Sequence, residues 1–69
     1  MKISARNVLK STVKSIVKGA VNTEVVLEVA PGIEIVSVIT KSSATALKLK
    51  KGKTAYAVIK ASSVLVAVD

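Results

Sequence analysis

The chain contains no cysteine and no histidine, and only four of its 69 residues are acidic. The absence of both residue types excludes disulfide bonds and removes the common zinc ligands. Two of the carboxylates, Glu24 and Glu28, lie on one face of a predicted strand about 13 Å apart, which is too far for a paired-carboxylate catalytic site. We therefore expect no catalytic residues, no direct metal-cation ligands and no cofactor, so the chain is predicted not to be an enzyme.

Aromatic residues are nearly absent, since Tyr56 is the only one. Single-strand-binding domains stack bases on aromatic side chains, so this composition argues against a nucleic-acid interface despite the lysine cluster in residues 48–53. We interpret that cluster as a solvated helix end. No apolar run approaches the roughly 18 residues that a membrane span needs, and the N-terminal residues lack the apolar core of a signal peptide. We expect a cytoplasmic protein.

Apolar and basic residues dominate what is present. The hydrophobic fraction is 51%, with thirteen valines, six isoleucines and five leucines, and the net charge is +7. A chain of this length buries only about 60% of the surface that its unfolded form exposes. Because this is more apolar material than one small barrel buries easily, we expect oligomerisation. The basic balance predicts an anionic partner.

The hydrophobic pattern predicts an all-β fold. Alternation runs through residues 3–8 and 9–18, and in the second stretch it sets Val13, Ser15 and Val17 opposite Lys14, Ile16 and Lys18. Further strands are predicted over residues 22–30, 33–40, 53–60 and 64–68. In residues 22–30 one face carries Thr23, Val25, Leu27 and Val29. In residues 33–40 both faces carry apolar side chains, which indicates an intersubunit surface.

Turn and cap residues separate these strands. Pro31 and Gly32 predict a type II turn. Thr40 or Ser42 is suited to cap a short helix over residues 43–49, which we expect to end in the lysine-rich segment before Gly52. The resulting order β-β-β-α-β-β is that of a five-stranded OB-type β-barrel with one short helix between strands 3 and 4. With no linker in the sequence, we expect one domain over residues 1–69.

Three short segments concentrate hydrogen-bond donors: residues 4–7, 40–44 and 60–63. Each combines cations with small hydroxyl residues and alanines, and none contains a carboxylate. Such a set suits a compact oxyanion, because the oxygens of a fully deprotonated oxyanion only accept hydrogen bonds. Arg6 and Lys60, with Ser4, Ser43 and Ser62, are the expected donors. The alternative for residues 40–44 is helix capping alone, and the same geometry is compatible with both roles.

A fourth candidate is the turn over residues 18–22, where a Gly-Ala step exposes successive backbone N–H groups that are able to form a shallow anion nest. Most Gly-Ala turns are only turns, so the composition by itself is a weak signal.

Several of these segments, in this order and spacing, resemble the molbindins, small cytoplasmic molybdenum-binding "Mop" proteins. The matching stretches are Ser4-Ala5-Arg6-Asn7, residues 14–25, residues 39–44 and residues 58–62, so the resemblance covers essentially the whole chain. It implies an OB-type barrel assembled as a homohexamer, a trimer of dimers, with oxyanions bound at subunit interfaces. By motif match, the dimer-interface site comprises Ser4, Ala5, Arg6, Thr40, Ser42, Ser43, Lys60, Ala61 and Ser62. The first and second groups are expected to come from different subunits. A second oxyanion site near the threefold axis is matched by Gly19, Ala20, Val21 and Asn22.

The chain departs from the expected pattern in two places. Pro31-Gly32 lies where we expect a different glycine turn, and Thr45 replaces an expected glutamate. Losing a carboxylate beside an anion site is not expected to harm it.

The resulting hypothesis is reversible binding and intracellular storage of molybdate or tungstate, with Arg6 and Lys60 neutralising the dianion. The two alternatives are a nucleic-acid-binding OB module and a purely structural oligomerisation domain.

Overall fold

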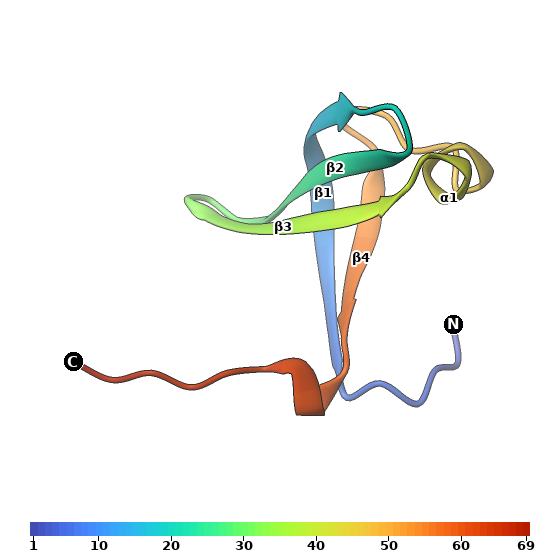
Figure 1. The fold of residues 1–69 in the computed structure, drawn as a ribbon. Helices are drawn as coiled ribbons and strands as arrows, with labels where there is room; N and C mark the ends of the chain where they lie inside the picture. Colours follow the sequence, from blue (N-terminus) through green and yellow to red (C-terminus); the bar gives the residue numbers. More distant parts are fainter.

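The computed structural model describes residues 1–69 and contains one antiparallel sheet of four strands in the order β3-β2-β1-β4. The strands are β1 (Asn7–Lys18), β2 (Asn22–Ala30), β3 (Ile33–Thr40) and β4 (Thr54–Ile59). A short helix, α1 (Lys41–Ala46), follows β3, and a single 3-10 turn, η1 (Ala61–Ser63), follows β4. The long β1 runs beside β4, while β2 and β3 cross the upper end of β1 next to α1 (Figure 1). The prediction of an all-β fold with one short helix is confirmed.

The hairpin of β2 and β3 forms as the sequence predicts. Both strands have the predicted bounds, and Gly32 in the connecting turn has a φ of 78°, the left-handed conformation that a type II turn requires. The face of β2 that carries Thr23, Val25, Leu27 and Val29 is the inward one, with Thr23 and Val25 almost fully enclosed. Alternation works here because the two strands pair residue by residue up to the bulge near the turn, so side chains two apart stay on one face.

The hydrophobic core is small for the amount of apolar sequence. It consists of Val13, Val25, Leu27 and Ala57, with partly buried aliphatic side chains packed against it. Only seven of the 69 residues are buried, and many large apolar side chains stay exposed, among them Val36 and Val38 on the outer face of β3. One copy of the chain therefore leaves much of its apolar surface uncovered.

A β-bulge in β1 changes which of its side chains face the core, so the predicted alternation is wrong beyond the bulge. The register shifts between Val13 and Ser15, so two residues of β1 stand where strict alternation allows one. Downstream of the bulge Ile16 packs against the core, and Val17, predicted to share a face with Val13, is 59% exposed. The extra residue also leaves Lys14 on the outside, where its ammonium group forms ion pairs with Glu28 (3.9 Å) and Glu34.

The helix begins and ends earlier than residues 43–49. Thr40 is the N-cap, and its side-chain oxygen accepts a hydrogen bond from the Ser43 N–H at 3.1 Å. After Ala46 the chain turns, and Lys48 adopts a φ of 53°, the only positive value outside glycine. The predicted cationic last turn is therefore wrong: the lysines follow the helix as a loop, and Lys53 donates to the carbonyl oxygens of Leu47 and Lys48.

The fifth strand, predicted over residues 64–68, does not form in the single chain. Those residues extend away from the sheet after η1 (Figure 1), and Leu65 and Val66 are 93% and 90% exposed. We call residues 64–69 the C-terminal tail. Residues 3–6, predicted to continue the first strand, also lie outside it. A strand needs a neighbour to accept its backbone hydrogen bonds, and neither segment has one within this chain. The sheet is curled and has four strands, so the predicted closed five-stranded barrel is not present in one copy.

No helix in the structure is long and apolar enough to cross a membrane.

Candidate functional site

Two of the three donor segments meet in one open concavity. It has a volume of about 590 Å³, and Arg6 and Lys60 supply its cations while Ser4 and Ser62 supply its hydroxyl groups. The remaining lining residues are Ile3, Ala5, Val58 and Ala61. No carboxylate lines the concavity, and every ion pair in the chain involves Lys14. The cations are therefore not neutralised by acidic side chains and are available to an anion.

The pairing of β1 with β4 brings these segments together. Asn7, the first residue of β1, lies opposite Ile59, the last residue of β4, and its side-chain amide donates to the Ile59 carbonyl at 3.3 Å. Residues 4–6 precede this pair and residues 60–62 follow it, so antiparallel pairing brings them to the same end of the sheet. Within η1 the Ser63 N–H donates to the Lys60 carbonyl at 2.9 Å, which turns the chain sharply beside the concavity.

The third donor segment, residues 40–44, lies at the opposite end of the sheet. Thr40 pairs with Asn22, beside the turn that follows β1, whereas Arg6 precedes the start of β1. The 12 residues of β1, at a rise of about 3.3 Å per residue, separate the two ends by up to about 36 Å along the strand. Figure 1 shows this separation, with α1 at one end of β1 and η1 at the other. One chain therefore does not bring Thr40, Ser42 and Ser43 to Arg6 and Lys60.

The hydroxyl groups of residues 40–43 form a local network. The Thr40 hydroxyl donates to the Ser43 hydroxyl oxygen at 2.7 Å and lies 3.3 Å from the Ser42 hydroxyl oxygen. Capping, one of the two roles considered for this segment, is thus present. Because Thr40 donates to Ser43, the proton of Ser43 stays free to point outward. The first-turn N–H of Ser42 also has no acceptor within the helix. Capping and outward donation are compatible at this exposed segment.

The turn over residues 18–22 has a structural role. The Gly19 N–H donates to the Asn22 carbonyl at 2.8 Å, and the Val21 carbonyl accepts from the Lys41 N–H at 2.8 Å. A Cβ at position 19 would stand 2.8 Å from the Asn22 oxygen, so the turn itself requires glycine there. Ala20 and Val21 are exposed. The turn thus joins β1 and β2 and anchors the start of α1.

The apolar part of the concavity was not predicted from the sequence. Ile3 and Val58 line it together with the cations and hydroxyls. Val58 stands two residues before Lys60 and shares its face of the chain by strand alternation, which is the signal that would have identified it.

Known proteins resemble this chain over nearly its whole length. Residues 3–66 match the TOBE domain. A probable molybdenum-pterin-binding protein of Haemophilus influenzae is 46% identical over 69 residues, covering all of both chains. The solved structure of a molybdate-binding protein from Sporomusa ovata is 43% identical and covers 99% of this chain and 100% of its own, with a TM-score of 0.91. The cytoplasmic molybdate-binding protein ModG, solved with molybdate bound, is 52% identical over 88% of this chain and 43% of its own, with a TM-score of 0.83.

A curled antiparallel sheet with a cationic concavity is the architecture of a small binding domain, and the relatives of this chain are molybdate- or molybdenum-binding proteins, not enzymes. The match over residues 3–66 and the relatives of equal length identify its family. The chain belongs to the TOBE-domain family and, within it, to the molbindins, the Mop-type molybdenum-binding proteins.

Proposed function

We propose that this protein binds molybdate or tungstate reversibly, without chemical conversion, and stores it in the cytoplasm. The observation that carries the proposal is the concavity in which Arg6 and Lys60 meet Ser4 and Ser62 with no carboxylate present. A tetrahedral dianion presents four acceptor oxygens, and these side chains present cations and hydroxyl donors. The names of its relatives, which are molybdate- or molybdenum-binding proteins, support the same ligand.

The proposed site needs two subunits. Thr40, Ser42 and Ser43 lie at the far end of the sheet from Arg6, so within one chain the concavity stays open and lacks their donors. A second copy that sets its residues 40–43 against the concavity adds the remaining donors and excludes water. Exclusion of water strengthens each charged hydrogen bond, because the local dielectric constant falls. Binding and assembly are then coupled, since an anion that binds only the assembled form stabilises it.

The open sheet supports this assembly and suggests how a dimer forms. Both edge strands, β3 and β4, have an unpaired side. Two apolar grooves of 300 and 380 Å³ lie between the edges, lined by residues such as Leu27, Ile35 and Val58. Residues 64–68 of the C-terminal tail are a continuous apolar run rich in valine, as in a strand covered on both faces, and they have no partner within the chain. We infer that the C-terminal tail of each copy enters the groove of the other copy and pairs there as a fifth strand. This reciprocal exchange closes two barrels that are related by a twofold axis.

Three such dimers give the proposed homohexamer. The outer face of β3, where Val36 and Val38 are exposed, supplies apolar surface for contacts between dimers. A second oxyanion site at residues 19–22, near the threefold axis of that hexamer, remains part of the proposal. Its remaining donors are the exposed N–H groups of Ala20 and Val21, since Gly19 donates within the turn.

Selectivity rests on size and protonation. Sulfate carries the same charge and the same acceptors as molybdate, so only the width of the assembled pocket separates the two. Hydrogenphosphate brings a proton donor, which a site built only of donors leaves unsatisfied.

The test is calorimetric titration of anion-free protein with sodium molybdate, with sodium sulfate as the control ligand. We expect heat from molybdate at one anion per subunit or slightly more, and little or none from sulfate. Arg6→Ala and Lys60→Ala each remove a charged hydrogen-bond donor, which contributes about 1.5–3 kcal/mol, so each should weaken binding about 10- to 150-fold. Lys51→Ala removes a lysine outside the concavity and should bind molybdate normally.

Each failure of this experiment has a distinct meaning. Normal molybdate binding by both concavity variants shows that the site is misplaced. No heat from either anion with intact hexamer rules out oxyanion storage. A titration with single-stranded DNA in a salt series then separates the two alternatives, because a nucleic-acid module loses affinity steeply with salt and a structural domain does not bind at all.

A further inference from the structure

One buried polar group in the chain has no partner. Thr23, the second residue of β2, is 0% exposed, and its hydroxyl is the only buried side-chain oxygen or nitrogen without a hydrogen bond. Almost all buried hydroxyl groups in proteins are paired with protein, with water or with a bound ion. The hydroxyl of Thr23 therefore needs a partner from outside the chain, either an ordered water or a bound ion.

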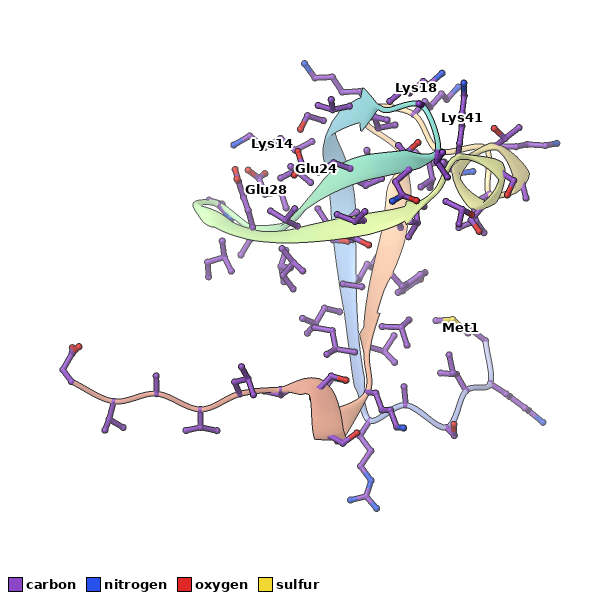
Figure 2. The ribbon with its side chains drawn as sticks, viewed as in Figure 1. Met1, Lys14, Lys18, Glu24, Glu28 and Lys41 are labelled. Atoms are coloured by element: carbon purple, nitrogen blue, oxygen red, sulfur yellow. The ribbon has the colours of Figure 1, made fainter.

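Thr23 lines a small pocket that is otherwise cationic. The pocket has a volume of about 240 Å³ and lies between the ends of β1 and β2, α1 and the loop after α1. Three lysines line it, Lys18, Lys41 and Lys48, and no carboxylate does. Figure 2 shows Lys18 and Lys41 extending from the same end of the molecule, beside α1. None of the three lysines forms an ion pair.

The backbone fixes these residues around the pocket. Lys18 is the cross-strand partner of Thr23, and the Lys41 N–H is bonded to the Val21 carbonyl at 2.8 Å. Lys48 lies just after α1, and its backbone N–H donates to the Thr45 carbonyl of the helix at 3.0 Å. Thr45 also lines the pocket, but its hydroxyl already donates to the Lys41 carbonyl within α1 at 3.0 Å. The free donors are thus three ammonium groups and the Thr23 hydroxyl.

We propose that this pocket is an anion site contained within one subunit, which takes a compact, multiply charged oxyanion with Thr23 as its buried donor. It is separate from the concavity at Arg6 and Lys60, at the other end of β1, and does not depend on it. It also differs from the backbone nest proposed for the turn over residues 18–22, because only the Lys18 end of that turn lines the pocket and residues 19–22 do not. An anion there relieves the repulsion among three unpaired lysines and gives the Thr23 hydroxyl a partner.

The chemistry of the pocket predicts broader anion selectivity than that of the concavity. A threonine hydroxyl accepts as well as donates, so Thr23 is able to accept the proton of hydrogenphosphate while the lysines bind its oxygens. Molybdate and phosphate are both suitable probes, and separate titrations distinguish which of them the pocket takes.

The key variant is Thr23→Val, which keeps the side-chain shape and removes the hydroxyl. It is made in an Arg6→Ala background, which weakens binding at the concavity, and the part of the remaining heat from sodium molybdate or sodium phosphate that is lost on adding Thr23→Val is assigned to this pocket. We expect Thr23→Val to weaken that binding roughly 3- to 10-fold, and Lys41→Met to weaken it at least as much. Lys51→Met, outside the pocket, is the matched control. In the anion-free protein Thr23→Val should raise the melting temperature, because it removes an unsatisfied buried hydroxyl.

A structure of the wild-type crystal soaked in sodium tungstate locates the anion directly. Anomalous density beside Thr23 and Lys18, lost in Thr23→Val, supports the site. The proposal is overturned by an empty pocket together with no residual heat in the Arg6→Ala background. It is also overturned if Thr23→Val lowers the melting temperature and leaves the affinity unchanged, since Thr23 is then satisfied by water as a structural residue. Neither result affects binding at Arg6 and Lys60, so the two proposals fail independently.

Discussion

The proposed exchange of the C-terminal tail makes a quantitative prediction about two neighbouring residues. Leu65 and Val66 are 93% and 90% exposed in the single chain, so replacing either by alanine should change the stability of an isolated subunit by less than about 0.5 kcal/mol. If the tail is a strand in a partner's barrel, successive side chains point to opposite faces, and only one of the two points inward.

The expected cost follows from burial. Truncating a buried leucine to alanine costs about 2–5 kcal/mol, and removing the two methyl groups of a buried valine costs at least about 1.6 kcal/mol. A reciprocal dimer contains the exchanged strand twice, which doubles the loss to at least about 3 kcal/mol. One of Leu65→Ala and Val66→Ala should therefore weaken the dimer at least about 100-fold, while the other has a clearly smaller effect and acts as its matched control.

Sedimentation over a concentration series measures this difference. Where the dimer is too tight to dissociate, the dependence of the urea midpoint on protein concentration reports the same free energy. A chain ending at Ser63 removes the whole tail and should associate more weakly than either variant. Tail exchange is refuted if the shortened chain and both alanine variants associate as tightly as the full chain.

Two further predictions concern the fold. Gly19→Ala puts a Cβ 2.8 Å from the Asn22 carbonyl oxygen, so the turn must shift. The free energy of unfolding, measured by urea denaturation, should fall by about 1–3 kcal/mol. A decrease below about 0.5 kcal/mol would show that this contact does not constrain the turn. The hydrogen bond and charge of Glu34, with a smaller contribution from Glu28, raise the pKa of Lys14 above the ordinary lysine value. The ion pair therefore stabilises the fold fully at a pH below the ordinary lysine pKa, and this stabilisation is lost as the pH rises through the raised pKa of Lys14. The stability difference between the wild type and Lys14→Met should therefore shrink from pH 8 to above about pH 11, with Lys50→Met as control; a difference independent of pH would show that the ion pair does not contribute.

Local patterns were sufficient for the β2–β3 hairpin, and they included Thr40 as one of two candidate caps of the helix. Residues 22–30 and 33–40 are rich in β-branched side chains, and Gly32 and Thr40 carry the turn and cap chemistry that ends each segment. The prediction was wrong where a tertiary adjustment changed the local rule. The bulge near Lys14 reversed the facing of Ile16 and Val17, because it inserts one residue that no alternation pattern reveals.

For the candidate site, the sequence identified the residue types and the structure decided which of them meet. A surplus of cations and hydroxyls without carboxylates was visible in residues 4–7, 40–44 and 60–63. That the first and third groups share a concavity follows from the pairing of Asn7 with Ile59, an antiparallel contact across 52 positions. Thr23 was predicted to share a face with Val25 and Leu27, but its burial and its missing hydrogen bond appear only when all surrounding atoms are known.

The sequence by itself thus determined the all-β class, the carboxylate-free donor segments and the family, because these depend on residue type and short-range spacing. Only the tertiary structure decided that the sheet has four strands in one copy, that the C-terminal tail lacks a partner and that the donor segments lie at two ends of β1. The physical reason is that a strand is defined by the neighbour that accepts its hydrogen bonds, and residues 64–68 have the composition of a strand without such a neighbour in their own chain.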